Sequence, residues 1–165
     1  MLAPAVPPST VSSPGTAPLP TPTTLSNPHP DGHGLQQATR TALADAGLTP
    51  ADIDHVSAHA NSTRAGDLAE ARALSHAFSS TSPPVTALKS LLGHSLGAAA
   101  TIQAACALLA LRHQAIPPAA NLDNQDDAVD LAIVSKAPRP ARLRAVLSTA
   151  CGFGGANAAL ILRGV

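Results

Sequence analysis

Aromatic side chains are almost absent from this 165-residue sequence, which has two Phe and neither Trp nor Tyr. Its 45% hydrophobic content comes mostly from Ala, Leu and Val, which suffices for the core of one domain. Two cysteines do not make a disulfide framework, so we expect a reduced, cytoplasmic setting. Ten basic and ten acidic residues cancel, so no net charge attracts nucleic acid or an anionic membrane.

Charge is missing from two long stretches. Residues 1–27 contain seven Pro and nine Ser or Thr but no charge, which predicts a disordered tail before a folded domain at 28–165. The N-terminus has neither the basic nor the apolar region of a secretory signal. The uncharged run from Leu91 to Leu111 is about as long as a membrane span. Four polar side chains within it favour a buried core helix and no membrane contact.

Hydrophobic periodicity and turn residues predict helices that alternate with short strands. The predicted helices cover residues 35–46, 66–78 and 94–113, and the predicted strands cover residues 53–57, 85–88, 145–149 and 158–162. Gly47 ends the first helix, because glycine readily adopts the left-handed conformation common after a helix C-terminus. A glycine-rich turn at 152–155 joins the last two strands. This alternation is typical of an α/β fold.

The segment His59-Ala60-Asn61-Ser62-Thr63 follows a predicted strand and precedes a predicted helix. His59 should therefore lie in a loop at the carboxyl end of the strand, where open α/β sheets bind ligands. The alternative is an ordinary loop histidine with capping hydroxyls nearby. A metal site made of His55 and His59 is disfavoured, because their four-residue spacing suits a helix rather than a strand and loop.

Gly93-His94-Ser95-Leu96-Gly97 matches the G-x-S-x-G nucleophile elbow of α/β-hydrolases, which would make Ser95 a nucleophile. That fold needs a buried strand before the elbow and the chain order serine, acid, histidine. Lys89 and Ser90 interrupt any such strand. His113 is the only histidine after Ser95, and it precedes the next acidic residues. We therefore place Ser95 in the first turn of a helix.

His94 has a different interpretation, as an active group with Lys89 beside it. A histidine at a helix N-terminus feels the positive end of the helix dipole, and a lysine nearby acts in the same direction. Both effects favour a neutral ring that donates a hydrogen bond to a carbonyl or enolate oxygen. The alternative is a buried histidine that caps its helix.

The turn Gly152-Phe153-Gly154-Gly155 lies between two predicted strands. Glycines let backbone N–H groups approach a ligand closely, so such a turn can supply an oxyanion-hole donor. A plain tight hairpin is the alternative.

Taken together, these segments resemble the C-terminal half of β-ketoacyl synthases. The matching stretches are Ala58–Glu70, Lys89–Ala99, Ile116–Asp123 and Gly152–Asn157. The resemblance implies a thiolase-like α/β fold, of which the chain is the C-terminal half of a five-layer αβαβα arrangement. It implies no metal and no cofactor other than the phosphopantetheine arm of an acyl carrier protein, which carries the substrate.

The resemblance also implies roles for single residues. His59 and His94 match the two histidines that assist decarboxylation of malonyl carrier protein, and Lys89 matches the lysine that supports them. Glu70 matches an acidic residue of the same network. Phe153 matches a gating residue whose backbone N–H helps to form the oxyanion hole.

On the substrate side, Thr63 matches a threonine that binds the phosphopantetheine arm, and Gly152 and Gly154 belong to the adjoining turn. Asn61 stands where the family usually has threonine, and its amide can still bind the pantetheine amides. Ala60 replaces a glycine, which is a small change unless the backbone there needs a positive φ.

The nucleophilic cysteine of the family lies in the first half, which this chain lacks. Cys106 falls inside an Ala-rich helix and is interpreted as a core residue. Cys151 directly precedes the glycine-rich turn, near which related thiolases place a second cysteine that acts as a base. A catalytic role for Cys151 therefore stays open, although one nearby motif does not assign a nucleophile.

The resemblance predicts half of an enzyme for the decarboxylative Claisen condensation of malonyl-ACP with an acyl thioester, in fatty-acid or polyketide biosynthesis. We expect it to be inactive alone and to need a nucleophile-bearing N-terminal half. Its expected partners are acyl carrier protein and that half or a ketosynthase homologue, in a homo- or heterodimer. Retention of His59, His94 and Lys89 argues against a chain-length-factor subunit. The alternative is a non-catalytic half that binds a carrier protein or ketosynthase, or a truncated gene product.

Overall fold

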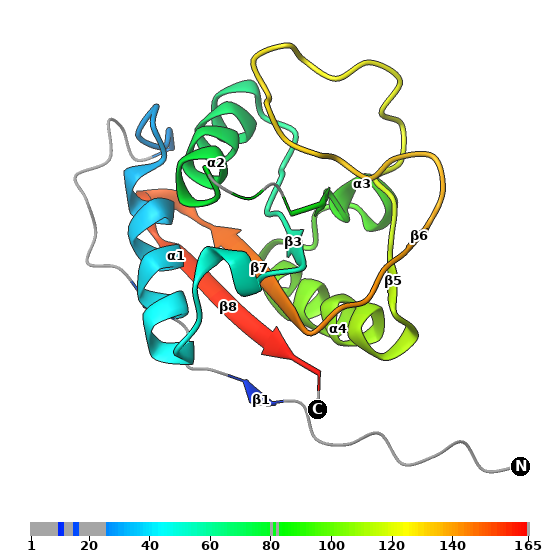
Figure 1. The fold of residues 1–165 in the computed structure, drawn as a ribbon. Coiled ribbons are helices and arrows are strands. Elements are labelled where there is room, and N and C mark those ends of the chain that lie inside the picture. The colour runs from blue at the N-terminus through cyan, green and yellow to red at the C-terminus, as the bar shows by residue number, and fades with distance from the viewer. Residues whose placement is uncertain (1–9, 12–14, 17–25, 80, 82, 165) are drawn as a thin grey trace, which may run out of the picture.

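The computed structural model describes residues 10–11, 15–16, 26–79, 81 and 83–164. A six-stranded mixed sheet forms the centre, with helices on both faces (Figure 1). Its strands are β1 (Thr10–Val11), β2 (Gly15–Thr16), β3 (His55–Ser57), β4 (Val85–Thr86), β7 (Ala145–Cys151) and β8 (Asn157–Arg163). The strand order is β1-β8-β7-β3-β4, and β2 also pairs with β8.

Strand direction decides which loops meet. β3 runs parallel to both β4 and β7, whereas β8 runs antiparallel to β7. The carboxyl ends of β3, β4 and β7 therefore lie at the same edge of the sheet, so the segments that follow these three strands are brought together.

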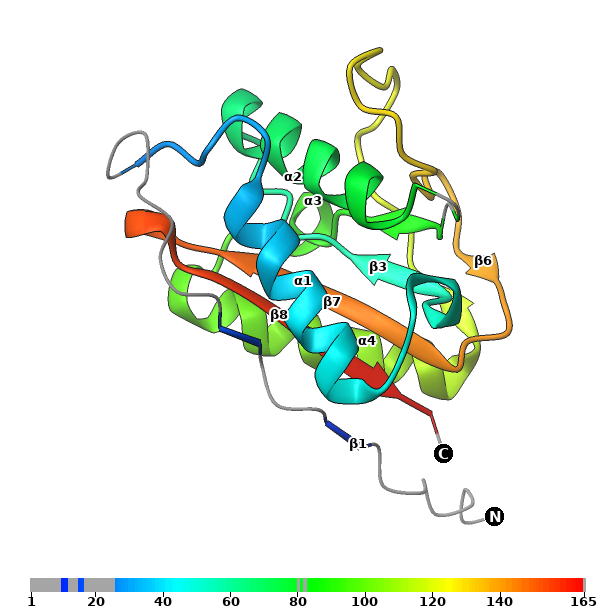
Figure 2. The same cartoon turned by 60° about the vertical axis from the view of Figure 1, so that its left-hand side comes forward.

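Two separate cores lie on the two faces of the sheet. Helices α1 (His33–Ala46) and α2 (Arg64–Ala77) cover one face, and α4 (Ala99–His113) covers the other (Figure 2). Successive side chains of a strand point to opposite faces. Accordingly Leu147 packs in the core beneath α1 and α2, while its neighbour Val146 packs in the core beneath α4.

The predicted first and second helices and the last two strands are confirmed within a few residues. In α1 the buried apolar residues follow the helical repeat from Leu35 to Leu43, which forms one stripe toward the sheet. Gly47 ends α1 with a φ of 64°, the left-handed conformation expected of it. A short 3-10 helix at Pro50–Asp52 precedes β3.

The predicted helix over 94–113 is wrong at its N-terminal end. A separate short helix, α3 (Lys89–Leu92), is followed by a loop, a 3-10 turn at Leu96–Ala98 and only then α4. Gly93 has a φ of 76° and Leu96 a φ of 51°, and neither value is compatible with a continuous right-handed helix. The composition does not predict this break, because the surrounding alanines and leucines all favour a helix.

The apolar helix, predicted to be a buried core helix, packs on the sheet with one face and is exposed on the other. Residues 96–113 are long and apolar enough to cross a membrane by length and composition, yet only 28% of this window is buried. One face of α4 packs on β7 and β8, whereas Ile102 and Leu109 on another face are 39% and 51% exposed.

The remaining elements are small. β5 (Ala115–Ile116) pairs with β6 (Arg139–Pro140), and the acidic stretch between them is irregular. β1 and β2 fall within the predicted tail of residues 1–27. Of the rest of that tail, only Ser26 and Asn27 are described. The prediction of disorder there stays a prediction.

Candidate active site

Three segments that are distant in the sequence meet at the carboxyl edge of the sheet. His59 follows β3, Lys89 follows β4, and the glycine-rich turn follows β7. They border a cavity of about 610 Å³, whose lining includes His59, Glu70, His94, Cys151 and Phe153. Parallel pairing of β3 with β4 and β7 is the physical reason that these motifs are neighbours.

His59 is buried and its ring is oriented by a lysine. The Nζ atom of Lys89 lies 3.3 Å from Nδ1 of His59 and also donates a hydrogen bond to the His59 carbonyl oxygen. An ammonium group can only donate, so Nδ1 accepts. In the neutral ring Nε2 then carries the proton. His59 can therefore offer an N–H donor to a ligand in the cavity.

Burial lowers the pKa of His59 to about 4, and the charges of Lys89 and His94 lower it further in the same direction. The ring is therefore neutral at pH 7. From the sequence, His94 was the histidine expected to lie near Lys89 as a neutral hydrogen-bond donor. The structure places the lysine against His59 instead.

Lys89 is held by a residue that the sequence analysis missed. Its Nζ donates to Oε1 of Gln103 at 2.7 Å. Gln103 is buried, and its Nε2 donates to the carbonyl oxygens of Ser57, Ala58 and Thr149 at 3.0–3.3 Å. One amide from α4 therefore joins the ends of β3 and β7 to the lysine. Burial also lowers the pKa of Lys89.

Glu70 holds the backbone of the His59 loop. Its Oε1 accepts the N–H of His59 at 2.9 Å and the hydroxyl of Thr149 at 2.7 Å, and its Oε2 accepts the N–H of Ala60 at 2.7 Å. Burial raises the pKa of Glu70, and these hydrogen bonds oppose that rise. Among the described contacts of Glu70 there is no hydrogen bond to Lys89, so the carboxyl group binds the loop directly and acts on the ammonium only through its charge, which opposes the lowering of the Lys89 pKa.

His94 lies in the exposed loop between α3 and α4, five residues before α4 begins. The prediction that it sits at a helix N-terminus, under the helix dipole, is therefore wrong. The alternative of a buried capping histidine is also wrong. Its ring meets the ring of His59 edge to face, with centroids 5.6 Å apart, and its Nδ1 accepts the N–H of Leu96 at 3.1 Å. The two histidines are thus neighbours at the cavity.

The predicted substrate-binding residues Asn61 and Thr63 both line the cavity but are engaged with each other. The Thr63 hydroxyl donates to Oδ1 of Asn61 at 2.8 Å and accepts the N–H of Gly66 at 3.2 Å, which caps α2. In this conformation the amide NH₂ of Asn61, rather than the Thr63 hydroxyl, is the group available to a ligand.

The glycine-rich turn closes the hairpin between the antiparallel strands β7 and β8, and a 3-10 turn at Phe153–Gly155 forms its tip. The N–H of Gly152 donates to Ala156 at 2.7 Å, and Gly154 takes a φ of 72°. The Phe153 side chain is 82% exposed at the cavity, and its backbone N–H has no hydrogen-bond partner among the described residues. The geometry is therefore compatible with an oxyanion donor at Phe153, whose role stays a prediction.

The remaining candidates do not form a second reactive centre. Cys151 ends β7 and lines the cavity, but burial raises the pKa of its thiol, which disfavours the nucleophilic thiolate. Ser95 lies in the exposed loop before the 3-10 turn, not in a helical turn as predicted. His55 is buried with its Nε2 3.1 Å from the Thr86 hydroxyl, and the one group of three or more metal-ligating side chains found among the described residues contains neither His55 nor His59.

Gln103 and Thr149 are recognisable in the sequence as polar residues in otherwise apolar segments. Gln103 is the one amide side chain within the apolar run from Leu96 to Leu111, and Thr149 is a hydroxyl in a buried strand. Isolated polar residues in buried segments need hydrogen-bond partners, which is a reason to place them at a site.

The chain has clear relatives. Residues 21–123 match the family model described as beta-ketoacyl synthase, C-terminal domain. A 3-oxoacyl-[acyl-carrier-protein] synthase 2 from Mycobacterium bovis is 47% identical over 133 residues, which are 81% of this chain and 32% of the relative. An actinorhodin polyketide β-ketoacyl synthase from Streptomyces coelicolor is 38% identical over 135 residues, 81% of this chain and 29% of the relative.

A solved structure of the ishigamide ketosynthase/chain length factor superposes with a TM-score of 0.88 at 34% identity, covering 94% of this chain and 38% of that one. The chain thus spans about a third of the length of the relatives it matches. The fold is that of ketosynthases, which is thiolase-like. With 103 of its residues inside the family match, this chain belongs to the β-ketoacyl synthase family and corresponds to its C-terminal domain.

Proposed function

We propose that this chain supplies the histidine-bearing half of a β-ketoacyl synthase, which condenses malonyl-ACP with an acyl thioester. The observation that carries the proposal is the state of His59, a buried neutral ring whose Nδ1 faces Lys89 and whose Nε2 carries the proton. His94 lies beside it at the cavity.

In this proposal the thioester oxygen of a malonyl group lies against the two histidines. Loss of CO₂ from malonyl leaves an enolate, and the negative charge gathers on that oxygen. A preorganised N–H donor stabilises such a charge more than it stabilises the ground state. Lys89 keeps the proton on Nε2, and Glu70 fixes the loop that presents the ring. The chain requires no cofactor of its own beyond the phosphopantetheine arm of the substrate.

The electrophile and its nucleophile have to come from elsewhere. Condensation transfers an acyl group that is first held on a cysteine, and in this chain burial raises the pKa of the Cys151 thiol. The relatives are about three times as long as the part that matches this chain. We therefore propose an N-terminal half, supplied by the same or another polypeptide, that carries the cysteine and completes the site.

The exposed apolar residues favour a second candidate, a half that only binds a ketosynthase or a carrier protein. Leu91, Leu92 and Leu96 of α3 and the following turn are 50%, 57% and 76% exposed, a set that suits a protein interface. Retention of both histidines and Lys89 favours the catalytic proposal over this one and over a chain-length-factor role.

The test is co-expression of this chain with an N-terminal ketosynthase half, followed by an assay of condensation between acyl and malonyl carrier proteins. We expect a complex that releases CO₂ and forms product. His59→Ala or His94→Ala should lower the rate at least about a hundredfold, as expected for groups that act in the transition state. His113→Ala, an exposed histidine at the end of α4, is the control and should keep the rate. A stable complex that does not catalyse condensation would contradict the catalytic proposal and support the binding role.

A further inference from the structure

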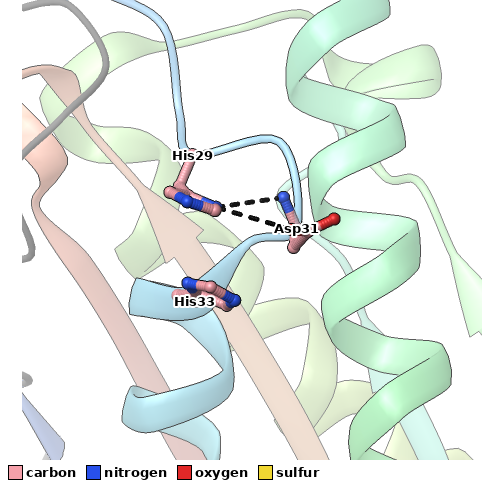
Figure 3. Close-up of side chains that lie close together, drawn as sticks. All are labelled: His29, Asp31 and His33. Atoms are coloured by element: carbon pink, nitrogen blue, oxygen red, sulfur yellow. Dashed lines mark hydrogen bonds and ion pairs between the residues drawn. The ribbon is translucent and has the colours of Figure 1, made fainter.

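A group of metal-ligating side chains lies outside the histidine pair just described. The segment from Pro28 to Gly34, at the start of α1, carries His29, Asp31 and His33 at alternate positions. Figure 3 shows the two rings stacked one above the other, with the carboxylate beside them. Ligand atoms of the three residues lie within 4.8 Å of one another, and the ring centroids are 4.1 Å apart.

The backbone that carries these side chains is held in place by the rest of the fold. Gln36 is buried and donates from Nε2 to the Asp31 carbonyl at 2.7 Å, and Arg72 of α2 donates to the Pro30 carbonyl at 3.1 Å. Gly32 has a φ of 62°, and a Cβ there would lie 2.3 Å from the carbonyl oxygen of Ala69. The turn is thus seated directly against α2.

We propose that His29, Asp31 and His33 bind a divalent transition-metal ion, of which Zn²⁺ suits the set best. Two imidazoles and one carboxylate are ligands that zinc accepts, whereas Mg²⁺ and Ca²⁺ prefer oxygen atoms alone. Zinc bonds of about 2.0–2.2 Å place tetrahedral ligand atoms roughly 3.4 Å apart, so the ligand atoms have to move closer by about an ångström. Three protein ligands leave a fourth position for water.

Two local features oppose the ion and one favours it. The positive end of the α1 dipole is close and disfavours a cation. His29 Nδ1 also accepts the N–H of Asp31 at 3.2 Å, and a metal on that atom would displace this hydrogen bond. The Asp31 carboxylate, 4.0 Å from Nδ1 of His29, supplies the compensating negative charge.

The position gives the ion a structural consequence. Pro28, His29, Gly32 and Gly34 all line the same cavity as His59 and His94. An ion held by this turn and by the first residue of α1 would fix that side of the cavity rim. Metal binding itself does not depend on the function proposed above.

The test is a zinc titration of the metal-free full chain against a chromophoric chelator, with Co²⁺ absorption to report the geometry. We expect one Zn²⁺ per chain and visible Co²⁺ bands typical of a low-coordinate nitrogen and oxygen site. His29→Ala and His33→Ala should each weaken zinc binding at least about tenfold, and Asp31→Asn should weaken it in the same direction. Circular dichroism checks that the variants fold.

Two controls separate this site from other histidines. His76→Ala removes an exposed histidine in the last turn of α2 and should leave zinc binding unchanged. The double variant His59→Ala/His94→Ala should also still bind one zinc. Unchanged affinity in His29→Ala and His33→Ala would overturn the proposal, as would loss of binding in the double variant or no uptake of zinc by the unaltered chain.

Discussion

Ala60 has a backbone φ of 37° in the loop that carries His59. An L-residue with a side chain pays about 1–2 kcal/mol in this left-handed region, because its Cβ approaches the backbone too closely. The family resemblance places glycine at this position, which has no such penalty. The structure therefore answers the question that the sequence left open: the backbone here does need a positive φ.

We therefore expect Ala60→Gly to raise the free energy of unfolding by about 0.5–1 kcal/mol. The substitution relieves the backbone strain, and the greater conformational entropy of glycine in the unfolded state offsets part of that gain. Urea denaturation measures the free energy of unfolding. Ala65→Gly, at an exposed position in the first turn of α2, is the matched control and should destabilise by up to about 1 kcal/mol. Equal destabilisation by both substitutions would contradict the strained geometry at position 60.

Lys89 acts on His59 through its charge, and this action can be measured. Lys89→Met keeps most of the side-chain volume but removes the positive charge next to Nδ1. We expect the pKa of His59 to rise from about 4 but to stay below 6.5, because burial, the larger cause, remains. An NMR titration of the histidine ring reports the value. Lys136→Met, which changes the only other lysine, should leave the pKa of His59 where it is.

At the scale of elements, the connection between β3 and α2 is organised by one carboxyl group. Glu70 reaches from the second turn of α2 to the N–H groups of His59 and Ala60, and Thr149 of β7 donates to the same carboxyl group. A helix, a loop and a strand thus share one buried acceptor. Loss of that acceptor leaves buried N–H groups without partners.

Glu70→Gln tests this arrangement, because the new NH₂ group would face backbone donors instead of accepting from them. We expect the free energy of unfolding to fall by about 1–3 kcal/mol. Asp45→Asn, on the exposed side of α1, makes the matched change of carboxylate to amide and should stay within about 0.5 kcal/mol of the original chain. If the two variants are equally stable, Glu70 does not hold the loop.

At the scale of the whole molecule, buried histidines make stability depend on pH. His55 is 1% exposed, and burial lowers its pKa from 6.5 to about 4. Between pH 6.5 and about pH 4, His55 is therefore protonated in the unfolded chain but neutral in the folded chain. The contribution of His55 is fully present above pH 6.5 and is lost as the pH falls through this window.

We expect the contribution of His55 to this loss to reach about 3 kcal/mol near pH 4. His59 has a similarly lowered pKa and adds to the loss in the whole chain, so the His55 contribution is measured as the difference between the unaltered chain and a His55 variant in the change of the free energy of unfolding from pH 7 to pH 4. His55→Gln keeps a polar group near Thr86 but cannot take up the proton, so its stability should vary less over the same range. His76→Gln, at an exposed site, should retain the full pH dependence. If the stability of His55→Gln depends on pH as strongly as that of the unaltered chain, the prediction is wrong.

The exposed leucines give a second whole-molecule prediction. Leu92, Leu96 and Leu109 are at least half exposed on α3, α4 and the turn between them. We expect the chain alone to self-associate through this apolar surface, and sedimentation velocity should show species larger than a monomer. Leu96→Ser combined with Leu109→Gln should shift the distribution toward monomer, whereas Arg112→Gln on the same helix should not. A compact monomer of the unaltered chain would contradict this expectation.

The sequence by itself determined the kinds of element and the order of the motifs. The apolar repeat from Leu35 to Leu43, the glycine at 47 and the alternation in the last two strands are local patterns, and local patterns fix local backbone geometry. The motifs around His59, Lys89 and Gly152 were sufficient for the family, which the comparisons confirm. These predictions required no knowledge of tertiary contacts.

The tertiary structure decided the contacts, because they join residues far apart in the chain. Lys89 lies 30 positions from His59 and Thr149 lies 90 positions from it, and only the parallel pairing of β3 with β4 and β7 brings them together. Because of that pairing, Lys89 lies against His59 instead of His94, and Gln103 can bind both Lys89 and the ends of β3 and β7. It also revealed the positive φ at Ala60, which depends on the loop closing over Glu70. Strand neighbours and loop closure depend on the whole chain, and no local pattern encodes them.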